Sequence, residues 1–206
     1  MTKNYFITIE GIEGAGKSSA VTVIEKFLQE KRLPYVLTRE PGGTKIAEQI
    51  RNLLLEHNSE QMCSDAELLL LFAARAQHLQ QLIIPALDAG KWVISDRFTD
   101  ASYAYQGAGR GISWDRVSAL ENWVQGDLRP DITILLDIDP EEGLKRAASV
   151  NVLDRIESEK IEFFREVRAS YLRLARENQK RFQVVDATQS VDEVGKQIIE
   201  ILTALM

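Results

Sequence analysis

The sequence is poor in the residues and segments that mark several classes of protein. Its single cysteine, Cys63, excludes an intramolecular disulfide and provides no thiol cluster for a metal. No uninterrupted apolar segment is long enough to span a membrane, since the most apolar part, around 68–85, contains arginine, histidine and glutamines. No charged-then-apolar secretory signal opens the chain. We therefore expect a cytoplasmic protein without a membrane partner.

An excess of basic residues is also missing. The chain has 25 basic and 31 acidic side chains, a net charge of -6, and so lacks the broad positive surface of a nucleic-acid-binding protein. Individual arginines can still bind small anions within an acidic chain. With 206 residues, 45% of them hydrophobic, the chain is large enough for one sizeable core. We expect a single domain over residues 1–206.

Short β-rich runs alternate with longer helical patterns along the whole chain. The predicted strands are Tyr5–Glu10, Tyr35–Arg39, Trp92–Asp96, Ile132–Asp137 and Phe182–Asp186. The predicted helices lie near 17–31, 44–57, 65–89, 113–125, 140–148, 159–179 and 191–205. Such alternation predicts an α/β fold of three layers, with a parallel sheet between helices. Nearly continuous apolar strands such as "ITILLD" indicate strands that are buried on both faces.

Polar residues follow or end several of these strands. They are Glu10, Arg39, Asp96, Arg97, Asp137 and Asp186. Ligands of open parallel sheets bind outside the carboxyl ends of the strands, so these side chains predict a common cleft.

The segment "GIEGAGKS", residues 11–18, follows the first strand and precedes a helix. It matches the phosphate-loop template G-x-x-x-x-G-K-[S/T], whose backbone N–H groups surround the phosphates of a nucleoside triphosphate. Lys17 would neutralise the transferring end, and the Ser18 hydroxyl would bind Mg²⁺ together with Asp96 from a neighbouring strand. The residues expected to bind the triphosphate are Gly11, Ile12, Glu13, Gly14, Ala15, Gly16, Lys17, Ser18 and Ser19.

A phosphate loop alone leaves a switch, a motor and a transferase open. A GTPase switch would need a guanine-reading N-K-x-D, which the sequence lacks, and a motor usually needs an arginine finger and more partner surface. A transferase needs a second anion site. Arginines near the ends of predicted elements offer one: Arg39, Arg51, Arg75, Arg97, Arg146 and Arg155. They favour a kinase of a small phosphorylated acceptor.

Seven segments in order resemble the bacterial thymidylate kinase family. They are "FITIEGIEGAGKSS", "TREPGGTKIAEQIR", "LFAARAQH", "DRFTDASYAYQGAGRG", "RPDITILLDIDPEEGLKR", "LDRIE" and "VVDATQS". The resemblance implies a five-stranded P-loop fold with a short lid, a homodimer, and ATP- and Mg²⁺-dependent phosphorylation of dTMP to dTDP for dTTP synthesis and DNA replication.

The resemblance also assigns residues to the phosphate and sugar of the acceptor. Glu13 would lie near the 3′-hydroxyl, and Arg39 and Pro41 would lie against the acceptor. Arg51 and Arg97 would hold its phosphate in line with the donor.

Five further positions are implied for the nucleoside of the acceptor. Phe72 and Arg75 are three residues apart and share one face of a helix, which suits stacking on a base and hydrogen bonding to it. Ser102 and Gln106, four residues apart, would add contacts to thymine. Tyr105 would crowd the 2′ position of the sugar and favour deoxyribose.

The lid is expected at about 146–158, within "LKRAASVNVLDRIES". The phosphate loop has no basic residue before Lys17, and the resemblance implies that in such family members lid arginines compensate, so that Arg146 and Arg155 would join Lys17 and Arg97 as catalytic cations. We expect Arg155, held by a fork-type pair with Asp154, to act in the transition state and Arg146 to contact ATP. The opposite division of roles stays open.

Two other functions remain alternatives on the sequence alone. One is another P-loop kinase of a nucleotide or nucleoside, and the other is a nucleotide-dependent regulatory or scaffold protein. A scaffold would not require the full set of Lys17, Ser18, Asp96 and Arg97, which favours an enzyme.

Overall fold

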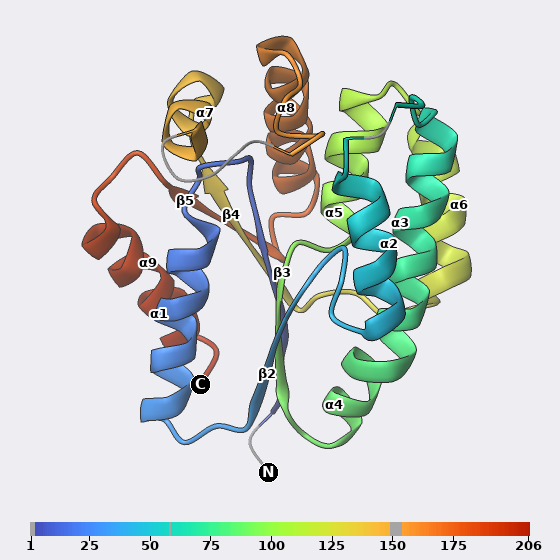
Figure 1. The fold of residues 1–206 in the computed structure, drawn as a ribbon. Coiled ribbons are helices and arrows are strands. Elements are labelled where there is room, and N and C mark those ends of the chain that lie inside the picture. The colour runs from blue at the N-terminus through green and yellow to red at the C-terminus, as the bar shows by residue number, and fades with distance from the viewer. Residues whose placement is uncertain (1–2, 58, 149–153) are drawn as a thin grey trace.

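A five-stranded, all-parallel sheet organises the chain (Figure 1). The computed structural model describes residues 3–57, 59–148 and 154–206. The strands are β1 (Phe6–Glu10), β2 (Tyr35–Arg39), β3 (Trp92–Asp96), β4 (Ile132–Asp137) and β5 (Phe182–Asp186). Their order in the sheet is β2-β3-β1-β4-β5, and all four neighbouring pairs are parallel. The predicted parallel sheet of five strands is confirmed.

Helices cover both faces of the sheet and complete three layers. In chain order they are α1 (Lys17–Glu30), α2 (Lys45–Leu55), α3 (Ser64–His78), η1 (Leu79–Ile83), α4 (Ile84–Asp88), α5 (Thr99–Ser102), η2 (Tyr103–Gly109), α6 (Trp114–Gln125), α7 (Pro140–Ala148), α8 (Ile161–Glu177) and α9 (Val191–Thr203). Figure 1 shows α1 and α9 on one side of the sheet and α2 to α6 on the other, with α7 and α8 near the carboxyl ends of the strands. The loop between β1 and α1 therefore lies at this end of the sheet.

The central strand β1 is buried on both faces, as its apolar sequence predicts. Ile7 and Ile9 belong to a core that includes Ile24 of α1, whereas Phe6 belongs to a second cluster with Leu79 and Phe98. Burying each such side chain contributes about 1.5–3 kcal/mol. The apolar packing of β1 thus holds the start of the phosphate loop in place.

Two helical regions differ from the sequence-based expectation. The helix expected over 65–89 is interrupted by the π-helical segment η1, just before Pro85. Proline lacks an N–H and its ring clashes with the carbonyl four residues earlier, and a wider turn relieves both problems. The helices α5 and η2, over 99–109, were not predicted as an element, because "TDASYAYQGAG" has weak helical periodicity and two glycines.

Across residues 3–57, 59–148 and 154–206, we find no helix with both the length and the apolar character required to cross a bilayer.

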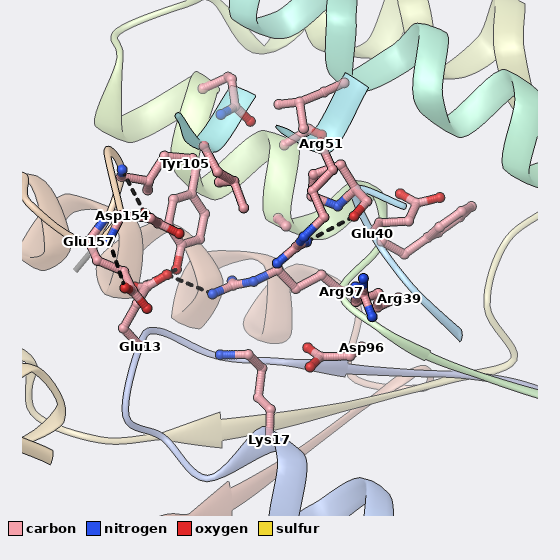
Figure 2. A pocket seen from close by; sticks show the side chains of 18 of the residues that line it. Glu13, Lys17, Arg39, Glu40, Arg51, Asp96, Arg97, Tyr105, Asp154 and Glu157 are labelled. Atoms are coloured by element: carbon pink, nitrogen blue, oxygen red, sulfur yellow. Dashed lines mark hydrogen bonds and ion pairs between the residues drawn. The ribbon is translucent and has the colours of Figure 1, made fainter. Parts of the chain in front are cut away.

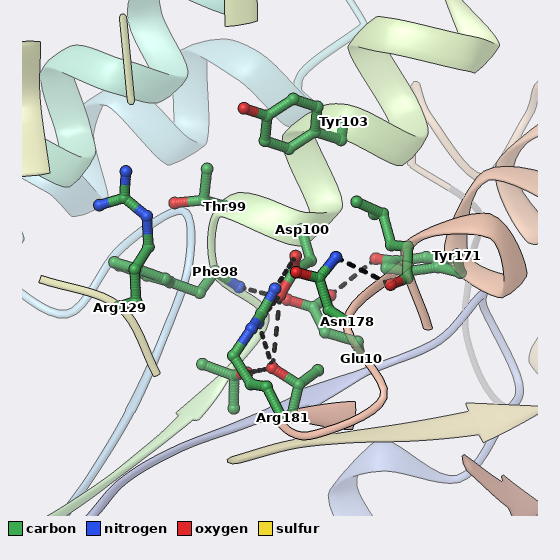
Figure 3. Close-up of polar contacts among 12 residues, drawn as sticks. Glu10, Phe98, Thr99, Asp100, Tyr103, Arg129, Tyr171, Asn178 and Arg181 are labelled. Carbon is green, nitrogen blue, oxygen red and sulfur yellow. Dashed lines mark hydrogen bonds and ion pairs between the residues drawn. The ribbon is translucent and has the colours of Figure 1, made fainter. Parts of the chain in front are cut away.

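A buried polar cluster lies under the carboxyl end of β1 (Figure 3). Both Glu10 oxygens are engaged: the Phe98 amide and the Tyr171 hydroxyl each donate to the carboxylate at 2.7 Å. Asp100, also buried, accepts two hydrogen bonds from Arg181 at 2.6 and 2.9 Å. Burial, with the negative charge of Asp100, raises the pKa of Glu10 to about 8.

This pKa predicts how stability depends on pH. Because the folded pKa lies above the ordinary value of 4.5, the folded state holds a proton that the unfolded state releases between pH 4.5 and about 8. The free energy of unfolding should then fall with rising pH in this window, by up to about 1.4 kcal/mol per pH unit. Glu10→Gln, whose amide can accept from the Phe98 N–H and donate to the Tyr171 oxygen, should flatten this decline in urea titrations from pH 5 to pH 8. The exposed Glu166→Gln is the control, and equal slopes for both variants would contradict the prediction.

Candidate active site

The phosphate loop has the backbone geometry that its sequence predicts. Gly11, Gly14 and Gly16 have φ values of 141°, 70° and 92°, which only glycine adopts readily. α1 begins at Lys17, so the positive end of the helix faces the loop. The Lys17 ammonium donates to the carbonyls of Gly11 at 3.1 Å and Ile12 at 2.9 Å, and therefore curls over the loop. Burial, together with the charge of Arg97, lowers the pKa of Lys17.

Close backbone packing fixes this loop against α7. A Cβ atom at Gly14 would lie 1.9 Å from the carbonyl oxygen of Gly143, and one at Gly143 would lie 2.6 Å from that of Glu13. Two glycines are therefore needed at this contact. The packing ties α7, which carries Arg146, to the phosphate loop.

A cavity of about 380 Å³ opens beside the loop, and Figure 2 shows the charged side chains that point into it. Thirteen of the predicted site residues line it: Glu13, Gly14, Lys17, Ser18, Arg39, Pro41, Arg51, Arg75, Asp96, Arg97, Ser102, Tyr105 and Gln106. They come from β1–α1, β2–α2, α3, β3 and the segment 99–109. The tertiary structure thus gathers five separate parts of the sequence around one space.

Arg97 links the phosphate loop to the opposite wall of this cavity. Its guanidinium donates to the Glu13 carboxylate at 2.7 Å and to the Gly11 carbonyl at 3.1 Å. It also lies over the Tyr105 ring, 4.7 Å from the centroid, and the Tyr105 hydroxyl donates to Glu13 at 2.8 Å. Arg97 has a φ of 68°, an uncommon backbone conformation for a residue other than glycine. Such conformations persist only where surrounding contacts enforce them, and they cluster at functional sites.

Inside the cavity wall, two of the three guanidinium nitrogens of Arg75 form hydrogen bonds. Its Nε donates to Glu40 at 2.7 Å, and one terminal nitrogen, Nη2, donates to the Phe98 carbonyl and the Ser102 hydroxyl. The other, Nη1, is the buried side-chain N or O atom that lacks a hydrogen-bond partner among the described residues. An unpaired guanidinium nitrogen beside a cavity is a donor available to a ligand.

Phe72 lies behind Arg75 and outside the cavity lining. Its side chain is 2% exposed, and the Arg75 guanidinium lies over the ring at 4.5 Å. The ring thus supports the arginine, and a direct contact of Phe72 with a base stays a prediction.

Two further arginines are held beside Pro41. Arg39 pairs with Glu48 at 2.8 Å, and Arg51 donates to the Pro41 carbonyl at 2.9 Å. Burial, together with the charge of Arg39, lowers the pKa of Arg51. The peptide bond between Glu40 and Pro41 is cis.

The lid arginines do not lie together, and one predicted pair is wrong. Of the expected lid, 146–158, residues 149–153 lie outside the described residues. The Asp154 carboxylate accepts the backbone N–H groups of Ile156 and Glu157 instead of pairing with Arg155. Arg155 pairs with the buried Glu67 at 2.6 Å and donates to the Leu54 carbonyl at 2.8 Å. The Asp154 carboxylate is hydrogen-bonded within its own turn. Arg155 therefore pairs with a residue that is distant in sequence.

A second, smaller pocket of about 50 Å³ lies on the other side of the phosphate loop. It is lined by Ala15, Gly16 and Ser19 from the loop and α1, and by Arg146. Arg146 also donates to the Ala187 carbonyl at 2.9 Å, at the start of the β5–α9 segment. Of the remaining predicted loop residues, Gly11 and Ile12 are buried and face the site with their backbone.

The residues near Lys17 fit a magnesium ion that is shared with a triphosphate. Ser18 is exposed in the first turn of α1, and Asp96 ends β3, and both line the larger cavity with Lys17. Mg²⁺ typically takes one or two protein oxygens and completes its shell with phosphate oxygens and water. The described residues contain no cluster of three or more His, Cys, Asp or Glu that could bind a metal without such a ligand.

Several residues of the site were not predicted. The larger cavity is also lined by Glu40, Leu55, Leu71, Phe98, Ala101, Asp154, Ile156 and Glu157, and the smaller one by Ala187, Gln189, Val191, Val194, Gly195 and Ile198, among others. Glu40 could have been found, because it directly precedes Pro41 in the "EPGG" segment. The apolar residues have no signal in the sequence that separates them from the core.

Comparisons with known proteins agree on one family. The thymidylate kinase family profile matches residues 9–198. Thymidylate kinases of Hahella chejuensis and Pseudomonas putida are each 52% identical to this chain, over 99% and 98% of its length and over 98% and 97% of theirs. The crystal structure of thymidylate kinase from Ehrlichia chaffeensis superimposes with a TM-score of 0.80 at 34% identity, covering 98% of this chain and 99% of that one. With the phosphate loop, the arginine-lined cavity and the five-stranded sheet, these matches place the chain in the thymidylate kinase family.

Proposed function

We propose that this protein transfers the γ-phosphoryl group of ATP to dTMP, forming dTDP for DNA precursor synthesis. The observation that carries the proposal is the unpaired Nη1 of Arg75, buried beside a cavity that begins at the phosphate loop. A buried guanidinium nitrogen is costly to leave without an acceptor, so the cavity calls for a ligand with a carbonyl oxygen at this position.

A thymine base meets the donors and acceptors of this wall. Its O4 carbonyl would accept from Arg75, and its N3–H would donate to the amide oxygen of Gln106. Ser102 already accepts from Arg75 at 3.1 Å and so keeps the guanidinium in place. A site that hydrogen-bonds a base in this way discriminates strongly against a base with the opposite pattern.

The charges on the loop side suit two phosphate groups that face each other. Arg39, Arg51 and Arg97 would hold the acceptor phosphate, and Lys17 the end of the donor. Phosphoryl transfer passes through a loose transition state, so catalysis requires positioning and charge neutralisation without a covalent intermediate. When bound at Ser18 and Asp96, Mg²⁺ would neutralise charge on the donor phosphates.

The smaller pocket suits the nucleoside of ATP. It adjoins Gly16 and Ser19 on the side of the loop that faces away from the acceptor cavity, and Arg146 lines it. A planar base could lie along the guanidinium there. Arg146 would then contact bound ATP, as predicted from the sequence.

The proposal includes a homodimer formed through the layer of α2, α3 and α6. α3 packs against both other helices, and the three carry exposed apolar side chains: Ile46, Leu53, Leu69 and Trp123. Trp123 is 82% exposed, and large apolar side chains gathered on one surface favour association. A cytoplasmic location stays a prediction.

The acceptor preference tests the proposed reaction directly. In a coupled ADP-release assay, we expect dTMP to give the highest kcat/KM, and dUMP about tenfold less, since it lacks one methyl group. For dCMP and dGMP the expected loss is about a hundredfold or more, because they leave polar groups unpaired. Lys17→Ala, which should abolish the signal, assigns it to this site. Comparable values for dTMP and dGMP would refute the proposal.

Tyr105 should select deoxyribose by the bulk of its ring. We expect Tyr105→Ala to reduce the preference for dUMP over UMP by about tenfold, the value of one lost close contact. Tyr105→Phe, which keeps the ring and removes the hydroxyl that donates to Glu13, should preserve the preference. The measurement is the ratio of kcat/KM for the two acceptors, and an unchanged ratio in both variants would reduce Tyr105 to a packing residue.

The dimer is tested by placing a charge at its expected centre. Trp123→Asp should shift the mass in analytical ultracentrifugation from about twice 23.3 kDa to the single-chain value, since burying an unpaired carboxylate opposes association. Ile199→Asp, at an exposed apolar position of α9 on the opposite side of the sheet, should leave the mass unchanged. A wild-type protein with the mass of one chain would contradict the dimer.

A further inference from the structure

Glu67 is a buried carboxylate outside the catalytic cavity that collects several donors. It lies in the first turn of α3 and is 1% exposed. Its oxygens accept hydrogen bonds from the Gln106 amide at 2.9 Å, from Arg110 at 3.2 and 3.3 Å, and from Arg155 at 2.6 Å. Burial alone would raise the pKa of Glu67, but the bonds from Gln106 and Arg110 lower it overall. An ionised carboxylate is therefore fixed at the meeting point of α3, η2 and the lid.

This carboxylate determines which end of the Gln106 side chain faces the cavity. An ionised carboxylate only accepts hydrogen bonds, so the group of Gln106 that contacts Glu67 must be its NH₂. Gln106 also lines the acceptor cavity, and among the described residues its side-chain oxygen has no hydrogen-bond partner. The amide oxygen is thus the end left for the base. An acceptor at this position suits a base nitrogen that carries hydrogen, such as N3 of thymine, and disfavours N3 of cytosine, which is itself an acceptor.

The same carboxylate holds the described part of the lid. Arg155 pairs with Glu67, and its main-chain N–H and side chain bond to the carbonyls of Leu55 and Leu54 at the end of α2. The next residues, Ile156 and Glu157, line the acceptor cavity. Arg155 therefore fastens this wall of the cavity, and its guanidinium is committed to a partner other than a phosphate.

We propose that Glu67 is a positioning residue for the acceptor: it orients the Gln106 amide so that its oxygen reads the base, and through Arg155 it fastens the part of the cavity wall formed by Ile156 and Glu157. This inference rests on the proposed function. It predicts that the effects of Glu67 concern dTMP and leave ATP binding unchanged, because Gln106 lines the acceptor cavity and Arg155 precedes Ile156 and Glu157, which also line it.

Glu67→Gln tests the proposal, since glutamine has the same shape but can donate as well as accept. The Gln106 amide can then turn over, and the lid loses its charge-assisted bond. We expect KM for dTMP to rise about tenfold, the value of one hydrogen bond, with KM for ATP within about twofold. The preference for dTMP over dCMP should fall about tenfold. Asp65→Asn is the matched control, because Asp65 lies in the same helical turn and forms an exposed pair with Arg116.

Two further variants separate the two roles of Glu67. Arg155→Ala should raise KM for dTMP without changing the preference over dCMP. On a Gln106→Leu background, Glu67→Gln should change that preference no further. If Glu67→Gln lacks a cooperative thermal transition, Glu67→Asp replaces it: this variant keeps the charge, withdraws the carboxylate by one methylene, and should show the same changes in smaller measure.

The outcomes distinguish this inference from the proposed function. A wild-type protein that does not phosphorylate dTMP overturns both. Where the wild type does so, constants for Glu67→Gln or Glu67→Asp equal to those of Asp65→Asn overturn the inference alone. An equal rise in both KM values with an unchanged preference also overturns it, because a merely structural role gives that result.

Discussion

The ion pair between Arg97 and Glu13 is the contact on which the arrangement of this site depends. It joins the residue that follows β3 to the middle of the phosphate loop, at 2.7 Å, and Tyr105 adds its hydroxyl to the same carboxylate. The left-handed backbone of Arg97 costs about 1–3 kcal/mol for a residue other than glycine. That cost is offset by contacts that bring the donor loop and the acceptor wall within reach of one guanidinium.

The cavity must hold several positive charges close together, because its function is to bind two anionic substrates. Two anionic substrates must lie close together, which requires several cations, but cations in one cavity repel each other before the substrates arrive. The structure pairs each arginine with a carboxylate or carbonyl: Arg39 with Glu48, Arg51 with Pro41, Arg75 with Glu40, and Arg97 with Glu13. These partners also limit the rotamers of the arginines, so less entropy is lost when a phosphate binds. An acidic protein can bind anions in this way.

In the lid, too, an arginine is paired with a carboxylate, but this pairing engages its guanidinium away from a phosphate. Arg155 was expected to approach the transferring phosphoryl group, but its guanidinium is bound by Glu67 and the end of α2. In this arrangement, Lys17 and Arg97 are the cations beside the loop within the larger cavity. Arg146 and Arg155 therefore lie at separate places, Arg146 beside the smaller pocket and Arg155 against Glu67.

The sequence by itself determined the fold class, the strands to within one residue, and the phosphate loop. These depend on local patterns. They are the apolar runs of the strands, the glycines that permit positive φ, and the G-x-x-x-x-G-K-[S/T] motif that binds phosphate. Tertiary structure alone decided the partners. Asp154 adjoins Arg155 in sequence but is satisfied by its own turn, whereas Glu67, 88 residues away, pairs with that arginine. Likewise, the burial of Phe72 outside the cavity lining depends on packing between segments. The sequence specifies which side chains can form hydrogen bonds and ion pairs, but only the folded chain determines which of them lie close enough to pair.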